Sequence, residues 1–151
     1  MGAIANDGGM GTVLTAIGDI KENTIKVLEA DGTRTSFRAA GKSAPVLEAV
    51  QDGDMTIEFD LMSMDKEVMA DLMGGTVTGD PGEEVWNRPL KKPVIERSFE
   101  IEDEEGVPMQ LPRVSLVGTI QNVYSPTDVN VIRVKGVVMQ PKKAGTAAVI
   151  W

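Results

Sequence analysis

The sequence predicts a mainly β fold, in which two packed antiparallel sheets form a sandwich or a partly closed barrel flanked by one short α-helix. Segments of alternating apolar and polar residues recur along the chain, and this period of two is typical of strands. Only one short segment has convincing helical spacing. Helical and strand patterns do not alternate, which argues against a parallel sheet. Packing two antiparallel sheets together would bury the apolar faces of such strands.

The chain length and the distribution of glycine predict the domain organisation. The 151 residues are enough for one domain with its own hydrophobic core. Residues 1–11 contain four glycines, so we expect a flexible N-terminal arm there. The remaining residues, 12–151, are expected to form a single β domain.

A β-hairpin is predicted over residues 23–38. The dipeptide Asp31-Gly32 suits a two-residue hairpin turn, because both central positions of that turn need a positive φ. Such a turn would place Glu29 opposite Arg34, which is a favourable cross-strand pair. The pattern of residues 39–54 fits either a strand or a turn of helix, and both alternatives stay open.

A strand and the helix follow in the middle of the chain. Residues 55–61 alternate strictly between apolar and polar side chains, which predicts a strand with one buried face. A helix is predicted over residues 65–73, because Asp65 is a good N-cap and the apolar residues form one stripe. Gly74-Gly75 would end it. About two turns are too few for an isolated helix, so we expect this helix to pack on a sheet.

The second half of the chain predicts a long loop and then further strands. Residues 76–93 are rich in glycine and proline, and structureless loops of this length are usually functional. Strands with turns between them are then expected over residues 94–102, 114–123, 129–139 and 146–151.

The composition argues against an enzyme. The chain has no His and no Cys, which removes the commonest general base, the commonest metal ligand and thiolate chemistry. No nucleophile motif of the G-x-S-x-G type is present, and a Lys-assisted serine is only formally possible. We therefore expect no catalytic residue, no cofactor and no metal site.

Charge and hydropathy narrow the classes of partner. The formal net charge of −8 repels nucleic acid on average, and the basic footprint of a DNA-binding domain is missing. No apolar run approaches the roughly 18 residues that a membrane helix needs. We expect a protein that is made in a cytoplasm and does not insert into membranes.

Two short patterns resemble known binding motifs without meeting their requirements. Gly41-Lys42-Ser43 resembles the end of a phosphate-binding loop, but that loop needs a glycine where Ser36 stands. A surface turn is therefore favoured. A second group of acids lies along a predicted strand instead of a calcium-binding loop, so a solvated or interfacial face is favoured; these acids are Asp52, Asp54, Glu58 and Asp60.

The densest acidic cluster comprises Glu100 and residues 102–105. Five acids around one hairpin tip lie in similar water, whereas a paired-carboxylate active site needs two different environments. A solvated turn is the first interpretation. The alternative is a charged rim that pairs with a basic patch on a neighbouring subunit, for which the candidates are Lys91, Lys92, Lys142 and Lys143.

The order of these features resembles the major tail tube proteins of long-tailed bacteriophages. A Gly-rich arm and an Asp-Gly hairpin precede the strand MTIEFDLMSMD, which leads into the helix DKEVMADLMGG. The loop TVTGDPGEEVWNRPLKKP follows, and the chain closes with VVMQPKKAGTAAVIW. The resemblance covers roughly residues 12–151, and it rests on patterns and not on invariant catalytic signatures.

The resemblance implies a passive structural role. Family members form six-fold rings that stack into a hollow tube, whose lumen passes DNA without specific binding. Implied partners are further copies of the chain, the tape measure protein, and tail tip and terminator proteins. The implied location is the virion tail, after assembly in the cytoplasm of the bacterial host.

The resemblance also suggests contact residues. The loop over residues 76–93 is the candidate for ring stacking, with Trp86 as an anchor unless it folds back on its own core. The interface candidates are Thr76, Val77, Trp86, Leu90, Lys91, Lys92 and the terminal Trp151. As a hypothesis, exposed acids supply part of the lumen wall: Glu58, Asp60, Glu96 and Glu100.

Three other functions stay open at this stage. A type VI secretion tube shares the fold and the six-fold ring. Another phage tail or head accessory protein would form one closed ring without a filament. A small-ligand β-barrel would be monomeric and enclose a pocket, but only 4% of the residues are aromatic, which makes a ligand cavity less attractive.

Overall fold

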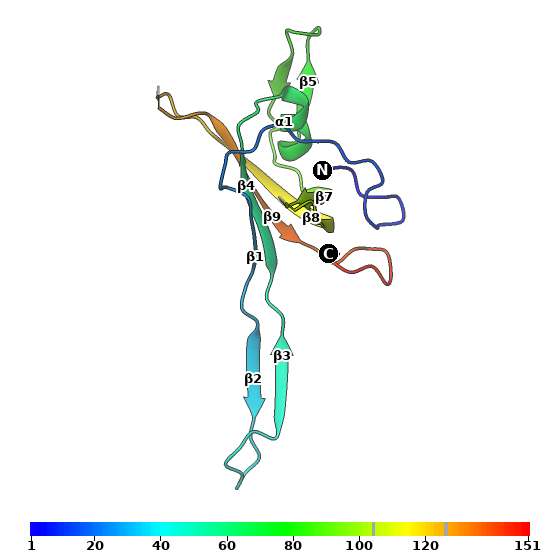
Figure 1. Cartoon of the computed structure of the whole chain (residues 1–151), viewed down its shortest axis with the longest axis vertical. Coiled ribbons are helices and arrows are strands. Elements are labelled where there is room, and N and C mark those ends of the chain that lie inside the picture. Colours follow the sequence, from blue (N-terminus) through cyan, green and yellow to red (C-terminus); the bar gives the residue numbers. More distant parts are fainter. Residues whose placement is uncertain (104, 126) are drawn as a thin grey trace.

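A five-stranded antiparallel sheet forms the centre of the computed structural model, which describes residues 1–103, 105–125 and 127–151 (Figure 1). The strand order is β1-β4-β9-β8-β7. In that order the strands span Lys26–Glu29, Met55–Leu61, Val131–Val138, Pro108–Gln121 and Ile95–Glu102. Every pairing within the sheet is antiparallel.

Two hairpins and one helix complete the secondary structure of the described residues. Strand β2 (Thr33–Phe37) pairs with β3 (Leu47–Gln51), and β5 (Thr76–Thr78) pairs with β6 (Val85–Asn87). Helix α1 spans Lys66–Met73. The predicted class, mainly antiparallel β with one short helix, is confirmed.

The core lies between one face of the sheet and α1. The helix contributes Met69, Leu72 and Met73, all of which are buried. The sheet contributes alternate residues of its strands, among them Phe59 and Phe99, whose rings meet edge to face with centroids 6.1 Å apart. We call this the core face of the sheet, and the opposite face the open face.

Helix α1 begins and docks as its sequence predicts. The Asp65 carboxylate accepts hydrogen bonds from the backbone N–H groups of Glu67 and Val68, at 2.8 and 3.3 Å. The helix then packs closely over Gly118 of β8. A Cβ atom at that glycine would lie 2.5 Å from Cγ of Met73, so only glycine allows this approach.

The predicted turn at Asp31-Gly32 is wrong. Strand β1 pairs with β4, so Glu29 lies opposite Met55 and not opposite Arg34. The chain continues past Gly32 without a positive φ, and β2 pairs with β3 in the same register that joins β1 to β4. Tertiary pairing overrides the local signal, because pairing β1 with β4 places Val27 beside Ile57 on the core face.

These four strands therefore form one long ribbon. Its outer half, β2 and β3, projects from the body and closes through residues 38–46 (Figure 1). The sequence left two alternatives for residues 39–54, a strand or a turn of helix. The structure shows a strand, β3, over part of this segment.

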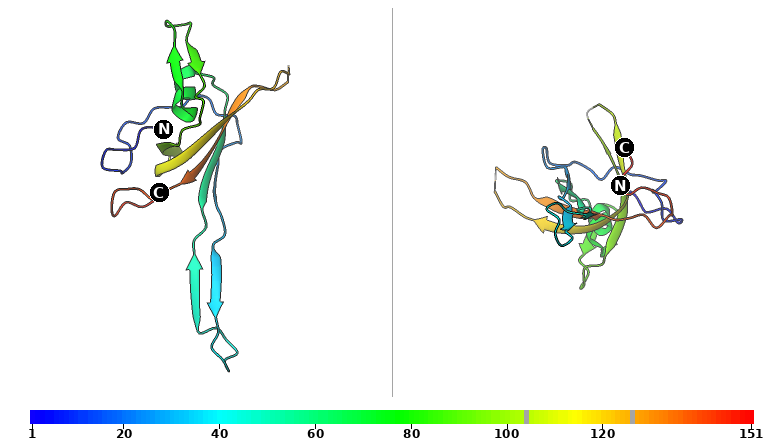
Figure 2. Two further views of the ribbon diagram at one scale, coloured as in Figure 1. Left: turned by 180° about the vertical axis from the view of Figure 1, so that it is seen from behind. Right: turned by 90° about the horizontal axis from the view of Figure 1, so that it is seen from below.

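The two termini lie on one side of the molecule, close to each other (Figure 2). Gly2 forms an isolated bridge with Ser98 of β7, and the Gly8 carbonyl accepts hydrogen bonds from the backbone N–H groups of Lys142 and Lys143. Residues 1–11 thus lie against the body, and their expected flexibility stays a prediction. The expected last strand, residues 146–151, forms only a bridge between Ile150 and Gln110.

Candidate assembly surfaces

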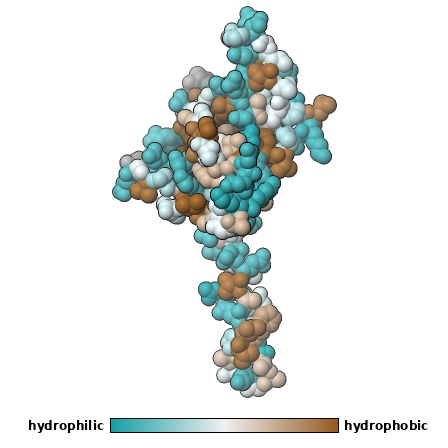
Figure 3. Space-filling model, turned by 90° about the vertical axis from the view of Figure 1, so that its right-hand side faces the viewer, coloured by the Kyte–Doolittle hydropathy of each residue, from teal (hydrophilic) through white to brown (hydrophobic). Residues whose placement is uncertain are grey.

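The β2–β3 hairpin is the most exposed element of the described chain. All ten residues of its two strands are exposed, although they include several large apolar side chains. Half of the Phe37 surface and 64% of the Leu47 surface are accessible to solvent. Figure 3 shows such apolar residues along the projecting arm. A two-stranded hairpin is marginally stable at best in water, and the residues of this one lie outside the core of their own chain.

The two faces of this hairpin differ in character. Because side chains alternate along a strand, the register places Phe37 beside Leu47, Thr35 beside Ala49 and Thr33 beside Gln51 on one face. We call this the uncharged hairpin face. The other face carries Arg34 and Glu48, whose side chains pair at 3.6 Å, together with Ser36 and Val50.

The hairpin also differs from the body in charge. Residues 33–51 contain three basic residues, Arg34, Arg38 and Lys42, against the single acid Glu48, which gives a net charge of +2. Since the whole chain carries −8, the remaining residues carry −10. Arg38 and Lys42 lie in the exposed loop at the hairpin tip, which also holds the Gly41-Lys42-Ser43 motif.

The open face of the sheet carries a row of ion pairs. The guanidinium of Arg133 donates to both oxygens of Asp60, each at 2.8 Å, and that of Arg113 donates to both oxygens of Glu96, at 3.0 and 2.6 Å. Lys135 pairs with Glu58 at 2.7 Å. A shallow hollow of about 610 Å³ lies on this face, and the exposed Val117 helps to line it.

These pairs hold the acids in their charged form. The hydrogen bonds from Arg133 lower the pKa of Asp60, against the opposing effect of burial. The hydrogen bonds from Arg113 lower the pKa of Glu96 in the same way. Both carboxylates are therefore ionised at neutral pH, and the adjacent guanidinium groups balance their charge.

The structure brings together three of the four acids expected at a lumen wall. Glu58, Asp60 and Glu96 share the open face, where each has a basic partner, so they do not make this face strongly negative. Glu100 lies further along β7, opposite Gln110, and accepts a hydrogen bond from Gln110 Nε2 at 2.7 Å. Their role as wall charges stays a prediction.

A groove lies on the core side of the sheet, where the helix does not cover it. The groove has a volume of about 260 Å³ and lies at the root of the β1–β4 ribbon. We call it the basal groove. Its lining is largely apolar and includes Met1, Ile17, Ile25, Ile57, Phe99 and Ile101, while Glu100 and Glu102 belong to its wall.

The residues expected to stack rings fall into two groups. Trp86 of β6 is partly buried against the core, and its Nε1 donates to the Gly74 carbonyl at 2.9 Å. It thus folds back on its own domain, as the alternative interpretation expected. Thr76 and Val77 belong to β5, so part of the predicted loop is a short hairpin.

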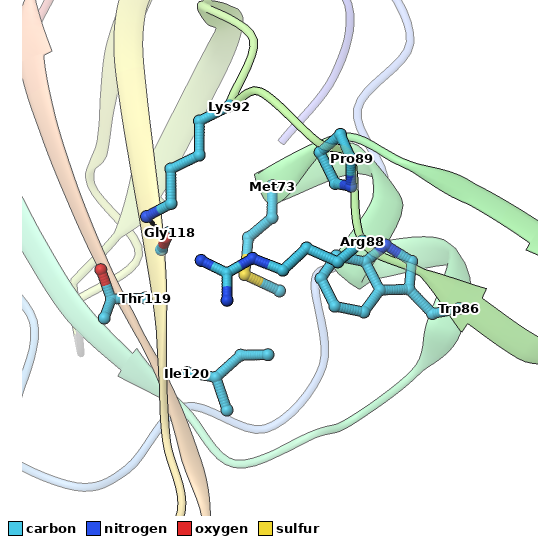
Figure 4. Close-up of a pocket in the computed structure, with 8 residues that line it drawn as sticks. All are labelled: Met73, Trp86, Arg88, Pro89, Lys92, Gly118, Thr119 and Ile120. Atoms are coloured by element: carbon cyan, nitrogen blue, oxygen red, sulfur yellow. Dashed lines mark hydrogen bonds between the residues drawn. The ribbon is translucent and has the colours of Figure 1, made fainter.

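The other stacking candidates are Lys92, which contacts β8 of its own chain, and three residues whose side chains are exposed to solvent. Lys92 donates to the Gly118 carbonyl at 3.1 Å and, with Trp86 and Arg88, lines a small pocket of about 120 Å³ (Figure 4). Leu90 and Trp151 are strongly exposed, at 110% and 79%, and Lys91 is also exposed. The structure therefore leaves these three available for contacts between subunits.

The acidic turn after β7 carries several exposed acids. Asp103 caps it by accepting hydrogen bonds from the backbone N–H groups of Glu105 and Val107. Glu104, part of the predicted cluster, lies outside the described residues. Of the basic residues suggested as partners, Lys143 already pairs with Asp7 of its own chain at 2.8 Å.

The described residues contain no arrangement typical of a metal site. Among them no group of three or more acids could hold a metal ion, and every buried side-chain nitrogen or oxygen has a hydrogen-bond partner. Helix α1 is the one helix among the described residues, and with eight residues it is far too short to cross a membrane.

The sequence itself matches no protein-family profile, and a search of curated proteins finds no match either.

Proposed function

We propose that this protein is a structural subunit that assembles with copies of itself into rings, and by stacking of rings into a tube. The resemblance to tail tube proteins of long-tailed bacteriophages supports this role. In that setting the tube would form part of the virion tail, and DNA would pass through it. No enzyme function is proposed.

The observation that carries the proposal is the projecting β2–β3 hairpin. Its strands contribute nothing to the hydrophobic core of their own chain, yet they present Phe37, Leu47 and Val50 to solvent. Burying apolar surface is worth roughly 25 cal/mol per Å², so an exposed arm of this kind favours association. A second chain that covers the hairpin would supply the contacts that a two-stranded hairpin needs.

The sheet has a second feature that suits assembly. Its edge strands β1 and β7 have free edges along much of their length, since β7 is bridged only at Ser98 among the described residues. Open edges invite pairing with another chain. A contact between two different surfaces of the same protein generates rings if the rotation closes and filaments if it does not.

Removing the hairpin tests the proposal. The ribbon register allows residues 31–53 to be replaced by Asn-Gly, because Ala30 and Asp54 already face each other through a 2.9 Å backbone hydrogen bond. We expect the wild-type chain to form rings or tubes at high concentration, seen by negative-stain electron microscopy and light scattering. The shortened variant should stay monomeric while keeping the folded sheet.

A matched control changes the charged face of the hairpin and leaves its length intact. The variant Ser36→Ala with Glu48→Gln should assemble like the wild type, since the uncharged hairpin face is untouched. If the wild-type chain stays monomeric at every concentration, or if the shortened variant assembles normally, the proposal is wrong. Single closed rings that never stack would point to an accessory ring protein instead.

A further inference from the structure

We propose that the tip of the β2–β3 hairpin docks in the basal groove of a second copy of this chain. This inference rests on the proposed function, because it names the surfaces that meet when copies assemble. The hairpin offers apolar side chains beside a basic tip. The groove offers an apolar lining beside two acids, so the two surfaces complement each other in both respects.

The apolar complementarity comes from the last pair of the hairpin. Phe37 and Leu47 lie side by side on the uncharged hairpin face, next to the closing loop. The groove presents Ile17, Ile25 and Ile101, which the fold of their own chain leaves only partly covered or exposed. Docking would remove both sets of side chains from water.

Complementary charges lie beside these apolar side chains, both at the hairpin tip and in the groove. Arg38 and Lys42 follow directly after Phe37 in the exposed tip loop, and in the described chain no ion pair involves either of them. Glu100 and Glu102 belong to the wall of the groove. A basic tip meeting this acidic wall both steers the encounter of two copies and fixes their orientation.

The open face of the sheet is a poorer acceptor. Its hollow is larger, at about 610 Å³, but its acids Glu58 and Asp60 already pair with Lys135 and Arg133. A basic hairpin tip would meet two cations there and would have to compete with them. In the basal groove the Met1 ammonium group lies near enough to Glu100 to interact with it, but neither Glu100 nor Glu102 forms an ion pair within the described chain. The charges therefore favour the basal groove.

The hairpin cannot reach the groove of its own chain. The groove lies at the root of the ribbon, beside Ile25 and Ile57, whereas the tip lies beyond Phe37. The seven steps along the chain from Ala30 to Phe37 rise by roughly 3.3 Å each, so the tip stands more than about 20 Å away and points outward. The contact must therefore join two copies, and when it is repeated head to tail it gives rings or filaments.

A charge exchange tests which surfaces meet. We expect the reversal of the tip, Arg38→Glu with Lys42→Glu, to raise the concentration needed for half-assembly on the order of tenfold or more. Reversal of the groove, Glu100→Lys with Glu102→Lys, should do the same. Combining all four substitutions should restore assembly. If neither reversal weakens assembly, or the combination fails to restore it, the groove assignment is wrong.

Crosslinking locates the contact directly, because the chain has no native Cys. Ala39→Cys marks the tip, Ala16→Cys marks the groove, and Thr119→Cys marks the open face as a decoy; all three positions are exposed. Each variant carries one cysteine, so a short bismaleimide that joins two different variants proves a contact between copies.

The mixture of the tip and groove variants should give on the order of tenfold more covalent dimer than the mixture of tip and decoy, since docking raises the local concentration. Dimers formed mainly with the decoy would overturn the groove assignment while leaving self-assembly intact. A wild-type chain that neither assembles nor crosslinks would overturn the proposed function as well.

Discussion

At the scale of single residues, the ion pair between Asp60 and Arg133 links the neighbouring strands β4 and β9 of the sheet. Asp60 lies on β4 opposite Arg133 on β9, and its side chain is only 10% exposed. The paired geometry, with two hydrogen bonds of 2.8 Å, is the strong form of a carboxylate–guanidinium contact. Glu58 pairs with Lys135 two residues away, but that pair is more exposed and has one hydrogen bond.

The two pairs should therefore contribute unequally to stability. We expect Asp60→Asn to lower the free energy of unfolding by about 1–3 kcal/mol at pH 7, because it leaves Arg133 without its charged partner. The matched variant Glu58→Gln should cost about 1 kcal/mol or less, as is usual for an exposed pair. Urea unfolding at a concentration that keeps the chain monomeric measures both values.

The Asp60 contribution should also depend on pH. The hydrogen bonds from Arg133 lower the pKa of Asp60 in the folded state below its ordinary value of 3.8. The unfolded chain thus binds the proton more readily, so the stabilisation is fully present above about pH 4 and is lost as the pH falls through the folded pKa. The gap between wild type and Asp60→Asn should narrow over that range, and a gap that stays constant would contradict this account.

At the scale of elements, helix α1 is held by its close approach to β8. Gly118 has no positive φ, so an alanine would strain no backbone and would restrict the unfolded chain, which alone stabilises by about 0.4–1 kcal/mol. Its Cβ would nevertheless lie 2.5 Å from Met73 Cγ and 3.3 Å from the Leu72 carbonyl. Overpacking of this kind costs about 1–3 kcal/mol, so the clash decides the sign.

We therefore expect Gly118→Ala to destabilise the chain and Thr119→Val, at the next position on the open face, to change stability by less than about 0.5 kcal/mol. The double variant Gly118→Ala with Met73→Ala separates the clash from other effects. Removing the Met73 side chain relieves the contact, so the double variant should lose less stability than the sum of the two single changes. Strict additivity in urea unfolding would show that this contact is not the cause.

Local chemistry explains which elements could be predicted from the sequence. The helix was predictable because Asp65 caps it and its apolar stripe faces the sheet, and strand β4 because its period of two matches its buried face. The absence of a turn at Asp31-Gly32 was not predictable. Strand β1 pairs with β4, and the chain continues through Gly32 into β2, which pairs with β3 in the same register. Register between distant strands has no local signal, so the sequence did not reveal the projecting hairpin.

The candidate surfaces divide in the same way. The alternation along β4 placed Glu58 and Asp60 on one face, but nothing local indicated that Lys135 and Arg133 would pair with them. The exposed positions of Phe37 and Leu47 depend on the register between β2 and β3, which the sequence did not reveal. The basal groove combines the N-terminal part of the chain with residues of β4 and β7, so no single stretch of sequence carries a signal for it.

At the scale of the whole molecule, the chain divides into a folded body and a projecting arm, the β2–β3 hairpin. The side chains of the arm do not pack against the core of the body. The core uses residues from α1 and from the five-stranded sheet, and it includes none from β2 or β3. The body should therefore fold without the arm, and the arm should gain stable structure from a second copy. Folding and association are then coupled by mass action, because a partner binds only the folded chain.

This coupling predicts that the melting temperature of the wild-type chain depends on its concentration. Above the concentration at which copies associate, each tenfold increase adds up to about 1.4 kcal/mol per contact, which for a chain of this size raises Tm by roughly 3–6 °C. The variant with residues 31–53 replaced by Asn-Gly should melt at one temperature whatever its concentration, because it lacks the arm. Differential scanning calorimetry over three decades of concentration makes the comparison. A concentration-dependent Tm that persists in the shortened variant would show that copies associate through the body, by its sheet edges or the open face, and that the hairpin is not the element that drives assembly.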